Sequence, residues 1–433
     1  MQTVVYYKNN QESNTKFAGL ATAVTWIKQQ KLFCFMNHIR LPMKTVKRTP
    51  RSKMEDLVVG IMSGVKCIRD INETTHRDKG LAKVLGRDSL ADQSLLSEML
   101  NKFDERSVEK LRSGVVNTNK KKSQALKDLR RGYRVMIDVD MTDLPCSKKC
   151  EGAKKGYTTS RKGTPVRQVS LIYASKHQEL LDIHLHAGNT HCTDPLKKEI
   201  QGFERQYGIT KKRRGKITLR VVSGYGSDGN ITWLCKRGYQ VLAKGYSSRR
   251  AAAIARSIKP NRRWIKVASD QYVLKVKQIK TIGVSHQALL VKTKSNKPKK
   301  GKWVYSLLIT NLKNKGPISL VKLYNQRQAI EKEIQQVKSV LGLKHKRKKS
   351  FHGMAALALF TLMANNILVW FKRTLAKSVH HLGLKRLIHE ILSIPGSISG
   401  CAKGFKVAIE SQYAFSKILL SLSKQQKTLP LGF

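Results

Sequence analysis

The sequence predicts a mixed α+β protein in which a strand-rich middle follows a helical front and precedes a helical end. Apolar residues recur at helical spacing between about residues 15 and 130, strand-like runs follow from residue 133, and helical spacing returns after residue 316. The chain has 433 residues, of which 40% are hydrophobic, so it can form two or three domains with cores of their own.

The helical front consists of short amphipathic segments. Residues 53–71 carry apolar side chains at helical spacing, and residues 89–103 follow with Ser89 or Asp92 placed to cap a helix. Short helices joined by polar turns fit a helix-turn-helix module as well as any other helical bundle. Composition does not separate these two interpretations.

The strand-rich middle begins with residues 133–140, YRVMIDVD. Side chains alternate between the two faces of a strand, so Asp138 and Asp140 share a face. Further strands are expected at residues 165–173 and 180–186, a helix at 193–207, a strand at 216–222, a helix at 230–236 and a strand at 239–243. The predicted order is therefore three strands, helix, strand, helix, strand.

Three more β-rich runs follow this order, at residues 271–278, 282–292 and 303–311, with a basic loop at 292–302. We interpret them as an inserted sheet module. A helix over residues 323–338 comes next, followed by the apolar segment 354–371, MAALALFTLMANNILVWF. This segment is the one candidate membrane span in the sequence, but Asn365 and Asn366 in its middle favour a buried core helix.

Several features of the chain indicate a cytoplasmic protein with no membrane partner. The first seven residues are uncharged and strand-like, so no signal peptide is expected. The seven cysteines are odd in number and scattered, which is typical of a reducing compartment and not of a disulfide framework.

The charge of the chain indicates a polyanionic partner. There are 84 Lys and Arg residues against 28 Asp and Glu, a formal net charge of +56. Nucleic acid fits best, because each neutralised phosphate releases condensed counterions. A membrane surface or RNA would also explain the charge. Basic runs at residues 120–122, 211–214, 297–302 and 344–349 fall between predicted elements, and together they indicate phosphate contact.

One helix face in the segment 323–338, LYNQRQAIEKEIQQVK, combines four polar side chains. At about 100° per residue, Tyr324, Arg327, Glu331 and Lys338 lie within an arc of about 60°. A solvent-exposed i,i+4 ion pair explains Arg327 and Glu331. It does not explain the alignment of Tyr324 and Lys338 with them.

The spacing Y-x2-R-x3-E-x6-K resembles the YREK signature of DDE transposases of the insertion-sequence-four type, the cut-and-paste elements of bacteria. The resemblance extends over essentially the whole chain. It implies a ribonuclease-H-like catalytic core interrupted by a β-rich insertion, with helical N-terminal and C-terminal regions. The expected domains are a helical region for DNA end binding at 1–130, the first part of the core at 131–265, the insertion at 266–315, core helices with the YREK stripe at 316–375, and a helical tail at 376–433.

The resemblance also implies metal-dependent DNA cleavage and strand transfer, with three carboxylates holding two Mg²⁺ or Mn²⁺ ions. Asp140 matches the first carboxylate, in a D-x-T pattern at the end of the first core strand, and Glu331 matches the third. Arg327 and Lys338 would contact DNA phosphates, with Tyr324 beside them. The implied partners are double-stranded element ends and target DNA, and a second copy of the chain in a paired-end complex. No small-molecule cofactor is expected.

The sequence departs from the family pattern at the second carboxylate. Residues 220–225, RVVSGY, match R-x-D-x-G-(F/Y), but Val222 stands at the aspartate position and cannot bind a metal. Three alternatives follow. The copy is catalytically impaired and acts only as a DNA-binding protein, or Asp228 substitutes although it is also placed to cap a helix, or Asp138 substitutes.

Other candidate sites are less specific. Cys146 and Cys150, in CSKKC, together with a later group suggest zinc, although incidental thiols are favoured; the later group is His184, His186, His191 and Cys192. Four tryptophans are expected mainly in cores, with one exposed ring available to stack on a flipped base; they are Trp233, Trp264, Trp303 and Trp370.

Overall fold

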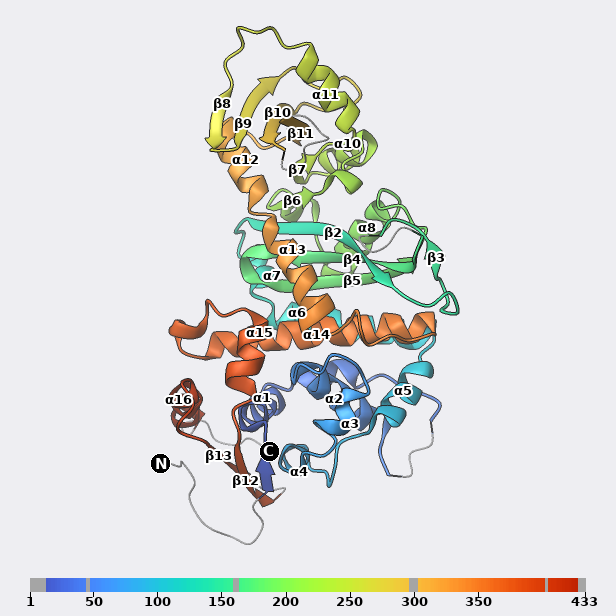
Figure 1. Cartoon of the computed structure of the whole chain (residues 1–433), viewed down its shortest axis with the longest axis vertical. Coiled ribbons are helices and arrows are strands. Elements are labelled where there is room, and N and C mark those ends of the chain that lie inside the picture. Colours follow the sequence, from blue (N-terminus) through green and yellow to red (C-terminus); the bar gives the residue numbers. More distant parts are fainter. Residues whose placement is uncertain (1–12, 44–46, 159–162, 296–302, 402–403, 427–433) are drawn as a thin grey trace. The chain divides into compact units, whose positions relative to one another are not determined.

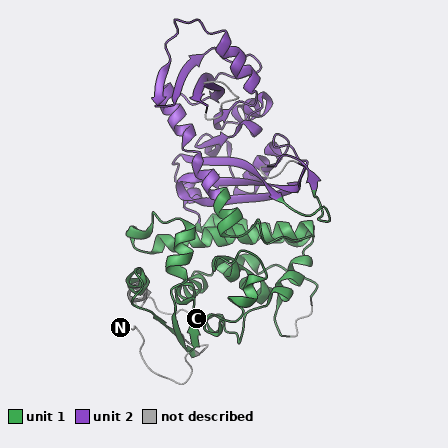
Figure 2. Ribbon diagram, in the orientation of Figure 1, with its two compact units in different colours: residues 1–122, 145–153, 334–433 green, residues 123–144, 154–333 purple. Residues whose placement is uncertain are grey.

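The computed structural model describes residues 13–43, 47–158, 163–295, 303–401 and 404–426 (Figure 1). The chain divides into two compact units, shown in Figure 2: a helical unit of residues 1–122, 145–153 and 334–433, and a sheet unit of residues 123–144 and 154–333. The predicted basic run at residues 297–302 and the strand-like first residues lie outside the described part of the chain.

Two of the three stretches of chain in the helical unit, the first and the last, contain its helices and its small sheet. Its N-terminal stretch contains β1 (Ser13–Thr15), α1 (Ala18–Gln29), η1 (Leu32–Met36), α2 (Pro50–Met62), α3 (Asp70–Glu73), α4 (Lys79–Val84), α5 (Gln93–Asn101) and α6 (Glu105–Lys122). Its C-terminal stretch contains η5 (Gln336–Val340), α14 (Phe351–Thr374), η6 (Lys377–Val379), α15 (Leu384–Arg386), η7 (Leu387–Leu392), β12 (Gly396–Cys401), β13 (Gly404–Ile409) and α16 (Ser416–Gln426). Strands β1, β12 and β13 form an antiparallel sheet, so the tail predicted as helical is helical only in part.

Local signals explain where the front helices begin and end. Asp92, and not Ser89, caps α5, because its side chain accepts a hydrogen bond from the Leu95 amide. The helix predicted over 53–71 is α2, which begins with Pro50 at its first position and ends before Gly64. Gly64 has φ +82°, a left-handed conformation that ends helices and that other residues rarely adopt.

Helix α14 is the buried core of the helical unit, which confirms the interpretation of segment 354–371. Within the described residues it is the one helix apolar and long enough to cross a membrane, and 94% of its most apolar window is buried inside the protein. The Asn366 amide donates a hydrogen bond to the Asn119 side chain of α6 at 3.0 Å, so this buried polar group is satisfied.

The basic runs were expected between the predicted elements, but two of them lie in helices. Residues 120–122 are the last turn of α6, and residues 211–214 form the short helix α9 (Lys211–Arg214). In the fourth run, residues 344–349, Lys346 and Lys348 are buried. The Lys346 ammonium donates to the carbonyls of Val65 and Leu341. These two buried ammonium groups are not available to DNA.

The sheet unit contains one ten-stranded sheet in the order β3-β4-β2-β6-β7-β11-β10-β9-β8, with β5 paired to β4. Its strands are β2 (Val135–Pro145), β3 (Lys154–Lys155), β4 (Pro165–Ala174), β5 (Glu179–Ala187), β6 (Ile217–Val221), β7 (Gln240–Lys244), β8 (Ile265–Ala268), β9 (Gln271–Val276), β10 (Gln287–Lys294) and β11 (Trp303–Thr310). Its helices are α7 (Gln124–Arg130), η2 (Ser175–His177), α8 (Leu196–Tyr207), α9, η3 (Ser223–Tyr225), α10 (Asp228–Lys236), α11 (Ser248–Arg256), α12 (Pro317–Asn325) and α13 (Gln328–Gln335), the last continuing into η5.

The predicted order of three strands, helix, strand, helix, strand is confirmed by β2, β4, β5, α8, β6, α10 and β7. Strands β2, β6 and β7 are parallel, whereas β4 and β5 are antiparallel to each other. The residues that follow β6 and β7 therefore come together beside the middle of β2, where its pairing with β6 ends at Val139.

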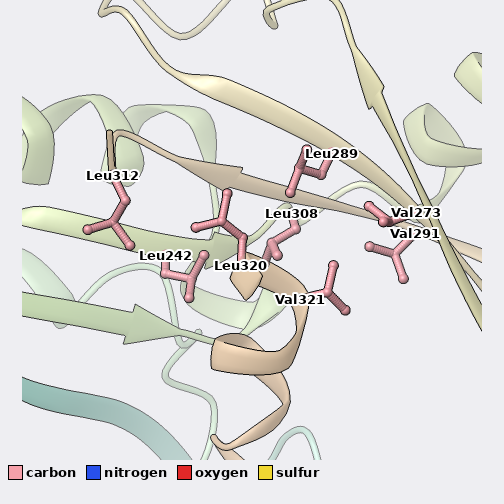
Figure 3. Packing of buried hydrophobic residues seen from close by; sticks show 8 residues of the cluster. All are labelled: Leu242, Val273, Leu289, Val291, Leu308, Leu312, Leu320 and Val321. Atoms are coloured by element: carbon pink, nitrogen blue, oxygen red, sulfur yellow. The ribbon is translucent and has the colours of Figure 1, made fainter. Parts of the chain in front are cut away.

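The β-rich runs after β7 are strands, as predicted, but they do not form a sheet of their own. Strand β11 pairs with β7, and β10, β9 and β8 follow in antiparallel order, so the core sheet simply continues. One apolar cluster spans β7, these strands and α12 (Figure 3): Leu242, Val273, Leu289, Val291, Leu308, Leu312, Leu320 and Val321. A shared core of this size makes the added strands part of the same folded body.

The helix predicted over residues 323–338 is interrupted twice. Helix α12 ends at Asn325, α13 begins at Gln328, and η5 is a π-helix. At the first break the Arg327 amide donates to the Tyr324 carbonyl at 2.9 Å and the Ile330 amide to the Arg327 carbonyl at 2.9 Å. These i→i+3 bonds tighten the chain, so the uniform 100° projection of the four polar side chains is wrong.

Candidate active site

Three side chains lie in one row where β6 and β7 end and where the pairing of β2 with β6 stops, in the middle of β2. Val139 pairs with Val221, and Val221 pairs with Ala243. The next residue along each strand is Asp140, Val222 or Lys244. Because strand residues alternate between faces, these three side chains share the face that carries Asp138, Arg220 and Leu242. Val222 therefore lies between the Asp140 carboxylate and the Lys244 ammonium.

Arg327 brings the first and last predicted carboxylates together. Its guanidinium donates from Nη1 to Oδ2 of Asp140 at 2.9 Å and from Nη2 to Oε1 of Glu331 at 3.0 Å. The Asp140 and Arg327 side chains are 14% and 10% exposed, whereas that of Glu331 is 61% exposed. One buried cation thus holds two acids, and one of them faces solvent.

Burial and charge shift the acid–base properties of this group of residues. Burial raises the pKa of Asp140, the Arg327 charge opposes that shift and the Glu331 charge adds to it. Burial works to lower the pKa of Arg327, but Asp140 and the other acidic groups around it raise it above its ordinary value. Burial and the Arg327 charge both lower the pKa of Lys244, against the Glu331 charge. The Lys244 ammonium is therefore an electrostatic neighbour of Arg327 and Glu331.

Tyr324 borders the site from α12 and Lys338 belongs to the other unit. Burial raises the pKa of Tyr324 to about 12, and the ring lies 6.0 Å from the Arg327 guanidinium, against the apolar cluster of Figure 3. Lys338 is half-buried in η5 of the helical unit. Its contact with DNA stays a prediction.

Asp138 lies two residues before Asp140 on the same face of β2, and both of its carboxylate oxygens accept hydrogen bonds. Arg220 donates to it from Nε at 2.6 Å and from Nη2 at 2.7 Å, and both side chains are almost fully buried. Arg220 also donates to the Leu323 carbonyl at 2.7 Å and the Ser175 hydroxyl at 2.9 Å. An ion at Asp138 would have to displace a buried guanidinium, which argues against its use as a substitute ligand.

Asp228, the other suggested substitute, is bound to different partners. Arg250 donates to it at 2.9 Å, and the Thr281 hydroxyl donates to its second oxygen. Ser227 caps α10, accepting from the Asn230 amide, so the cap predicted for Asp228 is wrong. Of the described hydrogen bonds and ion pairs, none joins Asp228 to Asp140 or Glu331.

The turn after β6 explains why its glycines are needed. A Cβ on Gly226 would lie 1.9 Å from the Lys244 carbonyl oxygen, and a Cβ on Gly224 would lie 2.6 Å from the Cys192 sulfur. The turn therefore packs closely against the end of β7 and against Cys192. Sequence reasoning missed Lys244 at the site, because only strand register places it there, and considered Cys192 only as a zinc ligand, because its packing against Gly224 depends on the folded loop.

A buried polar group beneath the turn could be mistaken for a nucleophile triad. His186 of β5 contacts Glu199 of α8 at 2.7 Å, and the Ser170 hydroxyl donates to the same carboxylate oxygen. Ser170 is fully buried and bonds the acid directly, so it cannot act as a nucleophile relayed through the imidazole. Nearby Tyr225 is also fully buried, and burial together with the Glu199 and Asp140 charges raises its pKa.

The residues of the zinc hypothesis have other partners. His184 contacts Asp182 at 2.9 Å and His191 contacts the Thr193 hydroxyl at 2.7 Å, while Cys146 and Cys150 are not part of a disulfide. Over the ranges that the structure describes, no three or more His, Cys, Asp or Glu side chains gather closely enough to hold a metal ion. Asp140 and Glu331 therefore have no third protein carboxylate beside them in those ranges.

The tryptophans are not all core residues, which corrects the expectation. Trp370 is buried in α14. The rings of Trp264, Tyr272 and Trp303 surround the Lys292 ammonium, which lies 4.3, 5.0 and 5.0 Å from their centroids. Trp233 stacks with Arg237 at 5.1 Å. These half-buried rings are held by cation–π contacts at the surface.

Comparison with known proteins identifies the family. The model described as "Transposase DDE domain group 1" matches residues 30–430. A cryo-EM structure of the piggyBac transposase synaptic complex with hairpin DNA is similar with a TM-score of 0.48 and 11% identity, covering 98% of this chain and 85% of that one. A crystal structure of a pre-cleavage Mos1 transpososome has a TM-score of 0.19 and 12% identity, covering 55% of this chain and 78% of that one. No curated protein sequence matches this chain.

Proposed function

Because this chain belongs to the DDE transposases, with the family model matching residues 30–430, we propose that it cuts the ends of its own DNA element and joins them to target DNA. Asp140 and Glu331 are the catalytic carboxylates of this proposal. The observation that carries it is the shared Arg327 guanidinium, which hydrogen-bonds both acids although they lie in distant parts of the sequence.

The residues at the site fit one divalent ion. Mg²⁺ is commonly held by one or two carboxylates, water and substrate phosphates, and Asp140 and Glu331 provide that number. A second protein-held ion does not fit, because Val222 offers no oxygen where the family pattern has its second aspartate. Bound there, the ion would polarise a phosphate and lower the pKa of a nucleophilic water.

The basic side chains of the site would bind the DNA backbone. Arg327 offsets the charge of the two acids, so a phosphate meets less repulsion there. Lys244, beside Val222, supplies a second cation at the carboxyl end of the sheet. We assign phosphate contact to Arg327, Lys244 and Lys338. Tyr324 would lie beside these contacts, in keeping with the YREK signature of the insertion-sequence-four type.

The wider assignments of the resemblance complete the proposal. The strand order β5-β4-β2-β6-β7 supports a ribonuclease-H-like core over residues 131–265, continued by the strands of 266–315 and the helices of 316–375. Residues 1–130 would bind double-stranded element ends, and a homodimer would pair those ends. We expect the protein to act in the cytoplasm.

The second candidate function is DNA binding without catalysis, as in a repurposed or decayed copy. Val222 favours it, and so does the placement of Lys244 in the same row, because a cation beside the ion site disfavours a second metal.

A cleavage assay combined with gel shift separates these functions. The substrate is duplex DNA carrying the inverted repeats that flank the coding sequence, incubated with Mn²⁺ or Mg²⁺. Cleavage by the unmodified protein that is lost in Glu331→Gln, with unchanged gel shift, would support the enzyme. Tight, repeat-specific binding with no cleavage in either protein would establish the binding-only candidate.

A further inference from the structure

The sheet unit contains a pocket at the end of its parallel strands opposite to Asp140. It has a volume of about 520 Å³, within the range of small-ligand sites. Its floor is formed where the parallel strands begin, by Met136 of β2, Thr218 of β6 and Gln240 of β7. Met136 and Asp140 lie four residues apart on one strand face, so about 13 Å separates this pocket from the catalytic row.

Four cations and no carboxylate line this pocket: Arg134, Lys176, Arg220 and Lys315. Arg220 is neutralised by Asp138, but it still turns two donor nitrogens toward Ser175 and Leu323, which are lining residues too. Arg134, Lys176 and Lys315 are exposed, and no ion pair holds any of them within the described ranges. Asp128 lies close enough to Lys176 to feel its charge, but its carboxylate is engaged by His177 and Gln124.

The rest of the lining is apolar. Val135, Met136, Leu312, Leu323 and Ala329 contribute carbon surface to the walls. A small inorganic anion would use the cations but leave these walls in contact with water. A ligand with an anionic end and a flat, weakly polar body would use both, because its body removes apolar surface from water while its charge meets the rim.

We propose that this pocket binds a nucleoside phosphate, either free or as one unit of a nucleic-acid strand. The phosphate meets Arg134, Lys176 and Lys315, and the base lies against the apolar walls. The site is distinct from the carboxylates, and binding here needs neither a divalent metal nor DNA cleavage, so it stands or fails apart from the proposed catalytic function.

An occupant would also touch the chain segment that carries the catalytic side chains. Leu323, Gln326 and Ala329 line the pocket and flank Arg327 at the junction of α12 and α13. The Leu323 carbonyl is tied to Arg220 at 2.7 Å. Binding therefore restrains the junction from the side away from Asp140.

Isothermal titration calorimetry on the full chain at about 150 mM salt tests the proposal, because that salt screens diffuse surface charge. The probes are AMP, pyrophosphate and a 5′-phosphorylated oligodeoxynucleotide of five thymidines. The double variant Arg134→Ala/Lys315→Ala should weaken AMP at least about tenfold, since two phosphate contacts are removed. Lys313→Ala, an exposed lysine two residues away that does not line the pocket, should change it less than about twofold.

A second variant tests the apolar walls. Ala329→Phe fills the cavity without changing charge, so it should weaken AMP much more than pyrophosphate. AMP binding that depends on these residues identifies a free nucleotide site, whereas binding of the oligodeoxynucleotide alone, with the same dependence, identifies a strand contact. Equal losses in the double variant and in Lys313→Ala would overturn the proposal, and so would no binding of any probe. Circular dichroism melting of each variant shows that the fold is kept.

Discussion

Val222→Asp tests the site directly, because it restores the carboxylate that the family pattern expects. Position 222 lies between Asp140 and Lys244 in the row that follows the aligned residues Val139, Val221 and Ala243. Neighbouring strands are about 4.8 Å apart, and two unit charges at about 5 Å interact by about 3 kcal/mol at an effective dielectric constant of about 20. Repulsion from Asp140 and attraction to Lys244 are therefore of similar size.

These two terms offset each other, so the substitution should be tolerated. What remains is the loss of half-buried valine surface, about 1 kcal/mol. Val222→Asn has the same shape and loses the same surface but adds no charge, which makes it the matched control.

Metal binding should then separate the two variants. An ion held with a Kd of about 1 mM stabilises the folded state by about 1.4 kcal/mol at 10 mM. For a domain of about 150–250 residues this raises Tm by about 3–6 °C. We expect this shift with Mg²⁺ or Mn²⁺ in Val222→Asp and a smaller one in Val222→Asn and the unmodified protein.

The assay is thermal unfolding with and without metal, followed by cleavage of an element end. Cleavage should rise in Val222→Asp and stay unchanged in Val222→Asn. If both variants show the same metal-induced shift and the same cleavage as the unmodified protein, position 222 is not beside the ion and the assignment of the strand ends is wrong.

Three further changes test other parts of the structure. Glu331→Gln should abolish metal-dependent cleavage but change the free energy of unfolding by less than about 0.5 kcal/mol, because the Glu331 side chain is 61% exposed. A large loss of stability in urea unfolding would contradict the assigned role of Glu331. Arg220→Met leaves the Asp138 carboxylate buried without its partner and should lower the free energy of unfolding by about 3–5 kcal/mol. Adding Asp138→Asn to the same chain should restore most of this loss. If Arg220→Met alone is as stable as the unmodified protein, the buried ion pair is refuted. Burial lowers the pKa of Lys346 to about 7, below its unfolded value of 10.5, so between these pH values the unfolded chain binds more protons and the free energy of unfolding increases with pH. Lys346→Met should remove this part of the pH dependence when unfolding is measured from pH 7 to 10.5. An unchanged slope would show that the ammonium is not desolvated.

The order of elements in the catalytic part of the sheet unit could be predicted from the sequence. Period-two and period-3.6 patterns are written into consecutive residues, so β2, β4, β5, α8, β6, α10 and β7 were all foreseen. The same local signals placed Asp140 on the first core strand and made Glu331 a helical acid, but the strand was expected to end at Asp140 and instead continues to Pro145. The long apolar segment was also recognisable as a core helix, since two asparagines interrupt it.

Strand neighbours and helix breaks could not be predicted in this way, because they depend on residues far apart in the chain. Asp138 pairs with Arg220 across 82 positions, and Arg327 meets Asp140 across 187. No local period says that β11 continues the sheet beside β7, or that Lys244 shares a row with Val222. The sequence alone therefore determined the chemical groups and the elements that carry them, whereas the tertiary structure decided which groups meet, because pairing between strands is settled by burial and hydrogen bonding over the whole folded unit.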